Sequence, residues 1–183
     1  MTHIDVRSAL HDSIPGDYSD LVTRRTGAAV RAVIEHRLAG LADGSVVFLD
    51  FSHIGILDRS CADEFVAKLM LPLTDDHPAR GGYVVFHGIN ECHLESIEAV
   101  LETHGLALVV QFPDGSTRLV GAVSEDERRC WRLVMEQGLA EATHVAQLTG
   151  LPSDACHTVL EGLARRRLLR VDGGRFHPLG SAA

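Results

Sequence analysis

The stretch that decides the fold runs from Ser45 to Leu73 and reads SVVFLDFSHIGILDRSCADEFVAKLMLPL. Four consecutive apolar residues follow Ser45, and such a run is typical of a strand buried on both faces of a sheet. Asp50 ends the run, and a short turn leads to apolar residues that share one helical face between Cys61 and Met70. Because Ser60 and Asp63 have the form of an N-cap with an acidic first turn, we expect Ser60 to cap this helix.

Working outward from this stretch, hydrophobic periodicity predicts further strands and helices. A helix is predicted over 19–41, interrupted by Gly27, and the alternation of Ile4 and Val6 with polar residues predicts a short edge strand. Downstream we expect a connection made of Pro72 and residues 74–82, strands over 83–86, 106–112 and 117–123, and a helix over 91–103. Strands that alternate with helices imply an α/β fold, with a mostly parallel sheet closed by one antiparallel hairpin.

The composition changes near residues 121–124, where we expect a second domain to begin. Ser124 followed by three acidic residues is typical of a capped helix start. The predicted elements are helices over 125–137, 141–149 and 153–167, the last capped by Ser153, and a hairpin over 168–177 that turns at Asp172-Gly173-Gly174.

Three short motifs in the first domain occur in order along the chain. They are RRTG at 24–27, LDFS at 49–52 and CADEF at 61–65. Together they resemble the STAS domain of anti-sigma-factor antagonists and, more closely, a STAS-like family of unknown function. The resemblance covers residues 1–122 and implies a mixed sheet with helices that docks a partner protein, of the anti-sigma kinase or ATPase type.

Residues 124–183 follow a different pattern, three helices and then a two-stranded ribbon. Alanines at 142 and 146 with Gly150-Leu151, ahead of Val159 and Leu163, resemble a winged helix-turn-helix, a small α+β domain. Such domains contact either DNA or protein, and both alternatives remain open here. The residues that would contact DNA are Ser153, His157, Arg165, Arg166, Arg170 and Arg175. Two further residues of the third helix, Asp154 and Glu161, are acidic and disfavour a phosphate-lined groove, so DNA binding would require a homodimer.

Polar residues gather where the central strand meets its helix, the place where open α/β sheets bind ligands. We interpret Asp50, Ser52, Asp58, Arg59 and Ser60 as a partner-binding surface. For Ser60 two roles remain open. The STAS resemblance implies phosphorylation by a partner kinase, although the family's acceptor follows the aspartate directly and Arg59 has that place here. The alternative is that Ser60 only caps the helix.

Charge and composition restrict the functional classes. Residues 1–120 carry nine Lys and Arg against 17 Asp and Glu, and residues 121–183 carry eight of each, so the acidic first domain would repel nucleic acid. The chain contains no P-loop, G-x-G-x-x-G or H-E-x-x-H motif, and its eleven histidines and four cysteines fall at no metal-ligand spacing. We therefore expect no cofactor or metal. The cysteines are interpreted as buried apolar side chains, with redox sensing as the alternative. A catalytic role survives only if the cleft above Asp50 holds a ligand.

These observations favour a non-enzymatic, cytoplasmic regulatory adaptor, because neither a membrane-spanning run nor a signal sequence is present in the 183 residues. The alternative is a DNA-binding transcriptional regulator whose STAS-like half senses a signal or dimerises.

Overall fold

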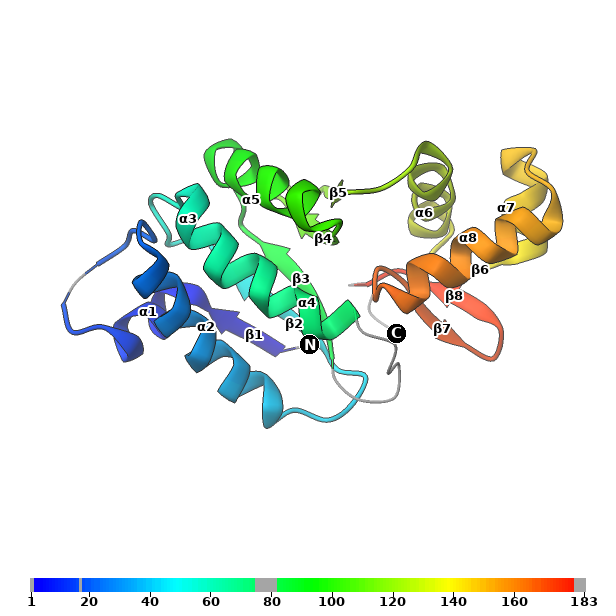
Figure 1. Ribbon diagram of the computed structural model, residues 1–183. Coiled ribbons are helices and arrows are strands. Elements are labelled where there is room, and N and C mark those ends of the chain that lie inside the picture. Colours follow the sequence, from blue (N-terminus) through cyan, green and yellow to red (C-terminus); the bar gives the residue numbers. More distant parts are fainter. Residues whose placement is uncertain (1, 17, 75–81, 180–183) are drawn as a thin grey trace. The chain divides into compact units, whose positions relative to one another are not determined.

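A computed structural model describes residues 2–16, 18–74 and 82–179. The chain forms two compact units, Met1–Ala122 and Val123–Ala183 (Figure 1). Together they make a mixed α/β structure with one five-stranded and one three-stranded sheet. No helix among the described residues has the length and apolar character needed to cross a membrane.

The sheet of the first unit follows the order of the chain, β1-β2-β3-β4-β5. Its first four strands are parallel and β5 is antiparallel to β4, so the predicted parallel sheet with one closing hairpin is confirmed. The strands are β1 (Thr2–Asp5), β2 (Val46–Asp50), β3 (Tyr83–His87), β4 (Ala107–Gln111) and β5 (Thr117–Gly121).

The helices of this unit share one hydrophobic core with alternate residues of the strands. They are α1 (Val6–Ser13), α2 (Arg24–Ala39), α3 (Arg59–Ala62), the π-helical turn η1 (Asp63–Ala67), α4 (Lys68–Thr74) and α5 (Glu91–His104). Phe51, directly after β2, lies at the centre of the core. Its ring stacks on Phe86 and Phe65 with centroid distances of 5.1 and 5.9 Å. The first residue after β2 therefore helps to fix where the following helix packs on the sheet.

The N-terminal part of the unit differs from the sequence prediction. Val6 begins helix α1 instead of continuing the edge strand, because Asp5 caps this helix by accepting a hydrogen bond from the Arg7 N–H. The second helix begins at Arg24, where Thr23 is the N-cap, so residues 19–22 lie outside it. Those four residues instead run beside the chain that follows β2.

The connection after the central helix also differs. Pro72 lies inside α4, where the sequence predicted a connecting segment. Most of that predicted segment, residues 75–81, lies outside the described part of the chain.

Over residues 123–179, the second unit contains three helices and a small antiparallel sheet of order β6-β8-β7. Its elements are α6 (Glu125–Gln137), β6 (Ala140–Glu141), α7 (Ala142–Thr149), α8 (Ser153–Arg165), β7 (Arg170–Asp172) and β8 (Arg175–His177). The capping box at the start of α6 is confirmed, since Ser124 and Glu127 exchange hydrogen bonds. The prediction that Ser153 caps α8 is wrong, because Pro152 occupies the N-cap and Ser153 is the first helical residue.

Candidate functional site

The turn after β2 leads into α3 through Asp58, which is the N-cap of that helix. Asp58 Oδ1 accepts hydrogen bonds from the Cys61 N–H at 2.7 Å and the Ser60 hydroxyl at 2.9 Å. The predicted cap at Ser60 is therefore wrong, because the carboxylate two residues earlier already binds the free backbone N–H. Ser60 is half-buried, and its hydroxyl donates a hydrogen bond to the Asp58 carboxylate that caps the helix.

The five residues predicted to form a partner-binding surface fall into two groups. Asp50 and Ser52 lie together at the end of β2, where Asp50 Oδ1 accepts the Ser52 N–H at 2.9 Å. Burial opposes ionisation of Asp50, but hydrogen bonds from Ser52 and the nearby His87 and His53 leave its pKa below the ordinary value. The other group is Asp58, Arg59 and Ser60 at the start of α3. No hydrogen bond or ion pair joins the two groups within residues 18–74.

Residues 19–22 and 55–58 form a short parallel ribbon. The Leu21 N–H donates to the Ile56 carbonyl at 2.7 Å, and the Asp58 N–H donates to the Leu21 carbonyl at 2.9 Å. Leu21 and Leu57 form the bridge and are buried. Because side chains alternate along such a ribbon, Val22 and Ile56 face outward, with 43% and 56% of their surface exposed. We call Val22, Ile56 and the neighbouring Arg59 the elbow surface.

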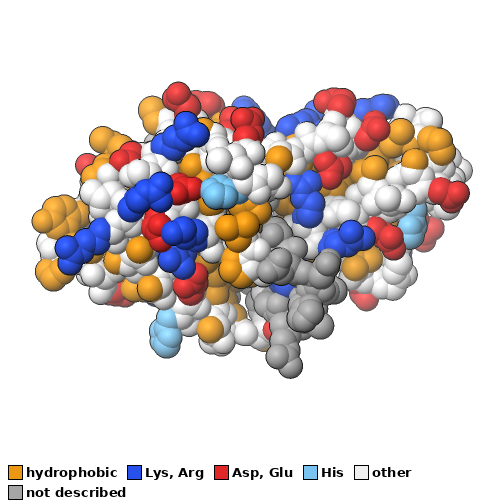
Figure 2. Space-filling view, viewed as in Figure 1, with side chains coloured by type: hydrophobic (Ala, Val, Ile, Leu, Met, Phe, Trp, Pro, Cys, Tyr) orange, Lys and Arg blue, Asp and Glu red, His pale blue; other side chains and the backbone are white. Residues whose placement is uncertain are grey.

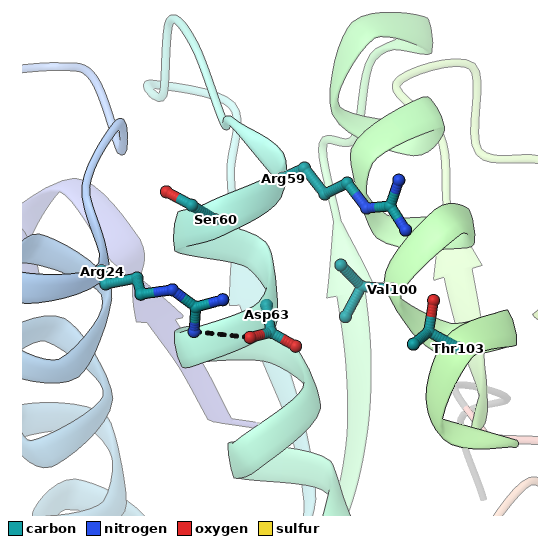
Figure 3. A pocket seen from close by; sticks show the side chains of 6 residues that line it. All are labelled: Arg24, Arg59, Ser60, Asp63, Val100 and Thr103. Carbon is teal, nitrogen blue, oxygen red and sulfur yellow. Dashed lines mark hydrogen bonds and ion pairs between the residues drawn. The ribbon is translucent and has the colours of Figure 1, made fainter.

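A pocket of about 400 Å³ lies beside this surface, between α3, η1 and α5 (Figure 3). The Arg59 side chain extends across it toward α5, from which Val100 and Thr103 project into it. Arg59 is exposed, and no residue of the described chain forms an ion pair or hydrogen bond with its guanidinium. The six residues that line the pocket are Arg24, Arg59, Ser60, Asp63, Val100 and Thr103.

The floor of the pocket belongs to a group of ion pairs that we call the ion-pair hub. Asp63 accepts hydrogen bonds from Arg24 at 2.6 Å and from His104 at 2.7 Å. Glu64 accepts from Lys68 at 2.6 Å and from Arg31 at 3.2 Å. The hub consists of these six residues, drawn from α2, η1, α4 and α5, and Figure 2 shows basic, acidic and histidine side chains side by side over this part of the first unit.

The hub holds both carboxylates in the ionised state. The hydrogen bond from His104 and then the charge and hydrogen bond of Arg24 lower the pKa of Asp63. Lys68 and then Arg31 lower the pKa of Glu64. The lowered pKa makes each carboxylate a weaker base than a free Asp or Glu side chain.

The first and third motifs of the sequence meet in space next to the hub. A Cβ atom added to Gly27 would lie 2.8 Å from the Cys61 carbonyl oxygen and 3.1 Å from its Sγ. One turn earlier on α2, Arg24 pairs with Asp63. The glycine therefore allows the close helix contact that brings the arginine to the acidic residue.

The DNA-contact candidates of the second unit differ in their surroundings. Ser153, His157 and Arg165 are exposed on α8, and Arg170 and Arg175 are exposed on the hairpin. Arg166 instead donates to Glu127 at 2.9 Å and is only about a quarter exposed, so it joins the end of α8 to the capping box of α6.

The described cysteines and histidines are scattered through both units. Within the described residues, no group of three or more His, Cys, Asp or Glu side chains is placed to hold a metal ion. Cys61, Cys130 and Cys156 are buried, and Cys92 is exposed. Burial raises the pKa of Cys61 and Cys130 to about 12, so these thiols are protonated and poorly reactive.

Sequence reasoning missed several residues of this region. The sequence pattern predicts only that His104 is near the end of a helix. Its contact with Asp63 joins residues 41 positions apart, which no local pattern can predict. Val22 reads as part of a helical face, although the N-cap signal at Thr23 could have excluded it. No protein-family model, curated protein or solved structure matches this chain.

Proposed function

We propose that the chain is a non-enzymatic regulatory adaptor. A STAS-like domain, residues 1–122, binds a partner protein of the anti-sigma type, a kinase or an ATPase. A winged-helix domain, residues 124–183, supplies a contact with protein or DNA.

The STAS-like assignment is supported by contacts between residues of its three motifs. Gly27 of the first motif packs against Cys61 of the third, and Phe51 of the second stacks on Phe65 of the third. Residues that carry a resemblance along the sequence thus form one structural unit around the turn after β2. The five-stranded mixed sheet with its helices is of the general kind that the resemblance implies.

The observation that carries the docking role is the elbow surface. Two exposed apolar side chains, Val22 and Ile56, lie on a hydrogen-bonded ribbon that leads to Arg59, whose guanidinium has no partner among the described residues. Interfaces between proteins are enriched in apolar side chains and arginine at their centres. A ribbon fixed by backbone hydrogen bonds also presents these groups with little ordering entropy left to lose on binding.

Arg59→Glu is expected to abolish partner binding while leaving the fold intact. The variant reverses an exposed charge, and reversing a charge that a partner covers weakens binding at least about 30-fold. The measurement is titration calorimetry of the purified chain against the products of neighbouring genes, ATP-binding proteins first. Circular dichroism should show an unchanged fold.

The matched control is Arg25→Glu. Arg25 is also exposed, lies on α2 and is not part of the pocket lining, and its replacement changes the net charge by the same amount. We expect it to retain binding within about threefold, as a rim charge does. Equal losses of affinity in both variants would mean that the net charge of the chain, and not Arg59, governs binding. If no product of a neighbouring gene binds, the adaptor role is contradicted.

A DNA-binding regulator is the second candidate, favoured by the exposed Arg170 and Arg175 on the hairpin. If the second unit binds DNA, Arg175→Ala should reduce the slope of log affinity against log salt by about one unit, because one phosphate contact is lost. Fluorescence polarisation with a labelled duplex between low and moderate salt measures this slope. Binding that is indifferent to salt and to Arg175→Ala would exclude DNA and leave the protein-contact role.

A further inference from the structure

The pocket beside Arg59 contains one positive charge that its own residues do not balance. Both carboxylate oxygens of Asp63 are occupied, Oδ2 by Arg24 and Oδ1 by His104. Arg24 and Asp63 therefore cancel at the floor of the pocket. Arg59 remains, with no acceptor among the described residues.

The hydroxyl groups in the lining cannot act as further donors without breaking bonds. Ser60 donates to Asp58 at 2.9 Å, and Thr103 donates to the Ala99 carbonyl at 2.7 Å. The available donors are thus the N–H groups of the two guanidiniums. A guanidinium binds a carboxylate or a phosphate through two parallel hydrogen bonds, so the pocket selects an anion.

The charge of the anion is limited by Asp63, which lies in the same pocket. A dianion such as phosphate would place its second charge near this carboxylate, whereas a single negative charge balances Arg59. Val100 supplies an apolar wall on the side of α5 (Figure 3), which suits the methylene groups of an acidic side chain. Outside the pocket, Val22 and Ile56 offer further exposed apolar side chains on the ribbon that leads into α3.

We infer that the pocket receives the carboxylate of an Asp or Glu side chain of the partner protein, bound by the Arg59 guanidinium. This inference rests on the proposed function and specifies the partner's contact. The partner presents an acidic side chain, flanked by apolar residues, to the elbow surface. Arg24 borders the same anion, and its ion pair offsets the charge of the Asp63 carboxylate at the floor of the pocket.

The inference can be tested without the partner, by nuclear magnetic resonance of the isotope-labelled full chain. The probes are an acetylated and amidated Leu-Glu-Leu peptide, the same peptide with Gln in place of Glu, and inorganic phosphate. The glutamate peptide should shift the Arg59 side-chain N–H, the Val100 methyl groups and the Thr103 amide, with millimolar affinity. The glutamine peptide should bind at least about tenfold more weakly, because its amide is neutral.

Two variants keep the test specific. Arg59→Gln should remove the response to the glutamate peptide, and Arg25→Gln, which changes an exposed arginine outside the lining, should retain it. Equal binding of the two peptides, shifts confined to other residues, or a preference for phosphate over the glutamate peptide would each overturn the inference.

The outcome is separable from that of the adaptor proposal. Loss of a protein partner in Arg59→Glu, without any response to the glutamate peptide, would leave the docking role standing and refute the carboxylate. A peptide response at the pocket with no binding partner among the neighbouring gene products would support the pocket and refute the docking role.

Discussion

Replacing Gly27 by valine is expected to destabilise the first unit by about 3 kcal/mol, near the upper end for overpacking a core. A Cβ atom at this position already lies 2.8 Å from the Cys61 carbonyl oxygen, which is backbone and cannot rotate away. The two methyl groups of valine would force α2 away from α3 and stretch the Arg24–Asp63 pair. Amide hydrogen exchange of the buried strands β2 and β3 measures the loss.

A smaller substitution at Gly27 and a matched one at Gly40 test whether the close contact with Cys61 causes the loss of stability. Gly27→Ala should cost less than the valine variant, because alanine adds one methyl group and gains about 1 kcal/mol in helix propensity. Gly40→Ala, at the other end of α2, should change the stability by less than about 1 kcal/mol, since its nearest neighbour is the Arg37 carbonyl at 3.7 Å. A Gly27→Val protein as stable as the wild type would show that the helices do not approach this closely.

The buried His93 is expected to make the first unit less stable in mild acid. The side chain is fully buried, and its Nε2 lies 3.0 Å from the Gly55 carbonyl, while no described residue pairs with Nδ1. Burial lowers the pKa of His93 in the folded protein, despite opposing hydrogen bonds to the backbone of Gly55 and Ile54.

The sign of the pH dependence follows from this lowered pKa. Above about pH 6.5, the ordinary pKa, His93 is neutral in both states and its contribution to stability is complete. Below that pH the unfolded chain binds a proton that the folded chain excludes. His93 therefore contributes a loss of up to about 1.4 kcal/mol per pH unit, until the folded pKa is reached. Urea unfolding between pH 7.5 and 5 measures the slope.

Exposed and buried histidines provide the comparison. His93→Gln should flatten the dependence of stability on pH across this interval, whatever its cost at neutral pH. His36→Gln should leave the slope unchanged, because the His36 side chain is exposed on α2. If the His93→Gln and wild-type slopes coincide, the buried imidazole is not the group that titrates.

Sequence patterns were sufficient for the sheet and for most helices. The apolar runs of β2, β3 and β4 have no alternation, as expected of strands covered on both faces, and the Pro113-Asp114-Gly115 turn makes β5 antiparallel to β4. The remaining predictions failed where neighbouring residues, or two secondary structures, compete for the same place in the chain. Asp58 and Ser60 are both good N-cap residues, and only the path of the chain out of Leu57 decides which of them reaches the Cys61 N–H. Helix α1 is short and follows its strand without a connecting segment, so period-two and helical patterns overlap at Val6.

The candidate site was less predictable because its contacts are distant in sequence. Arg59 and Ser60 could be singled out from the residues next to them. The partners of Asp63 lie 39 and 41 positions away, at Arg24 and His104, and their distances depend on how three helices pack. The pocket arises from the same packing and has no local signature.

The elements α3, η1 and α4 follow one another without a break, and the π-helical turn η1 changes the direction in which the side chains of α4 point relative to those of α3. Cys61 and Leu69 are eight positions apart, which in a regular α-helix places them about 80° out of phase. Both are buried in the same core, at opposite sides of a stripe of ordinary width. A π-turn accommodates one additional residue, so the pair behaves as if it were seven apart, about 20° from alignment. The surplus residue lies within Asp63–Ala67, the segment that carries both hub carboxylates. The irregularity that presents these two acidic groups to α2, α4 and α5 thus also brings the buried side chains before and after it closer to a single line along the helix.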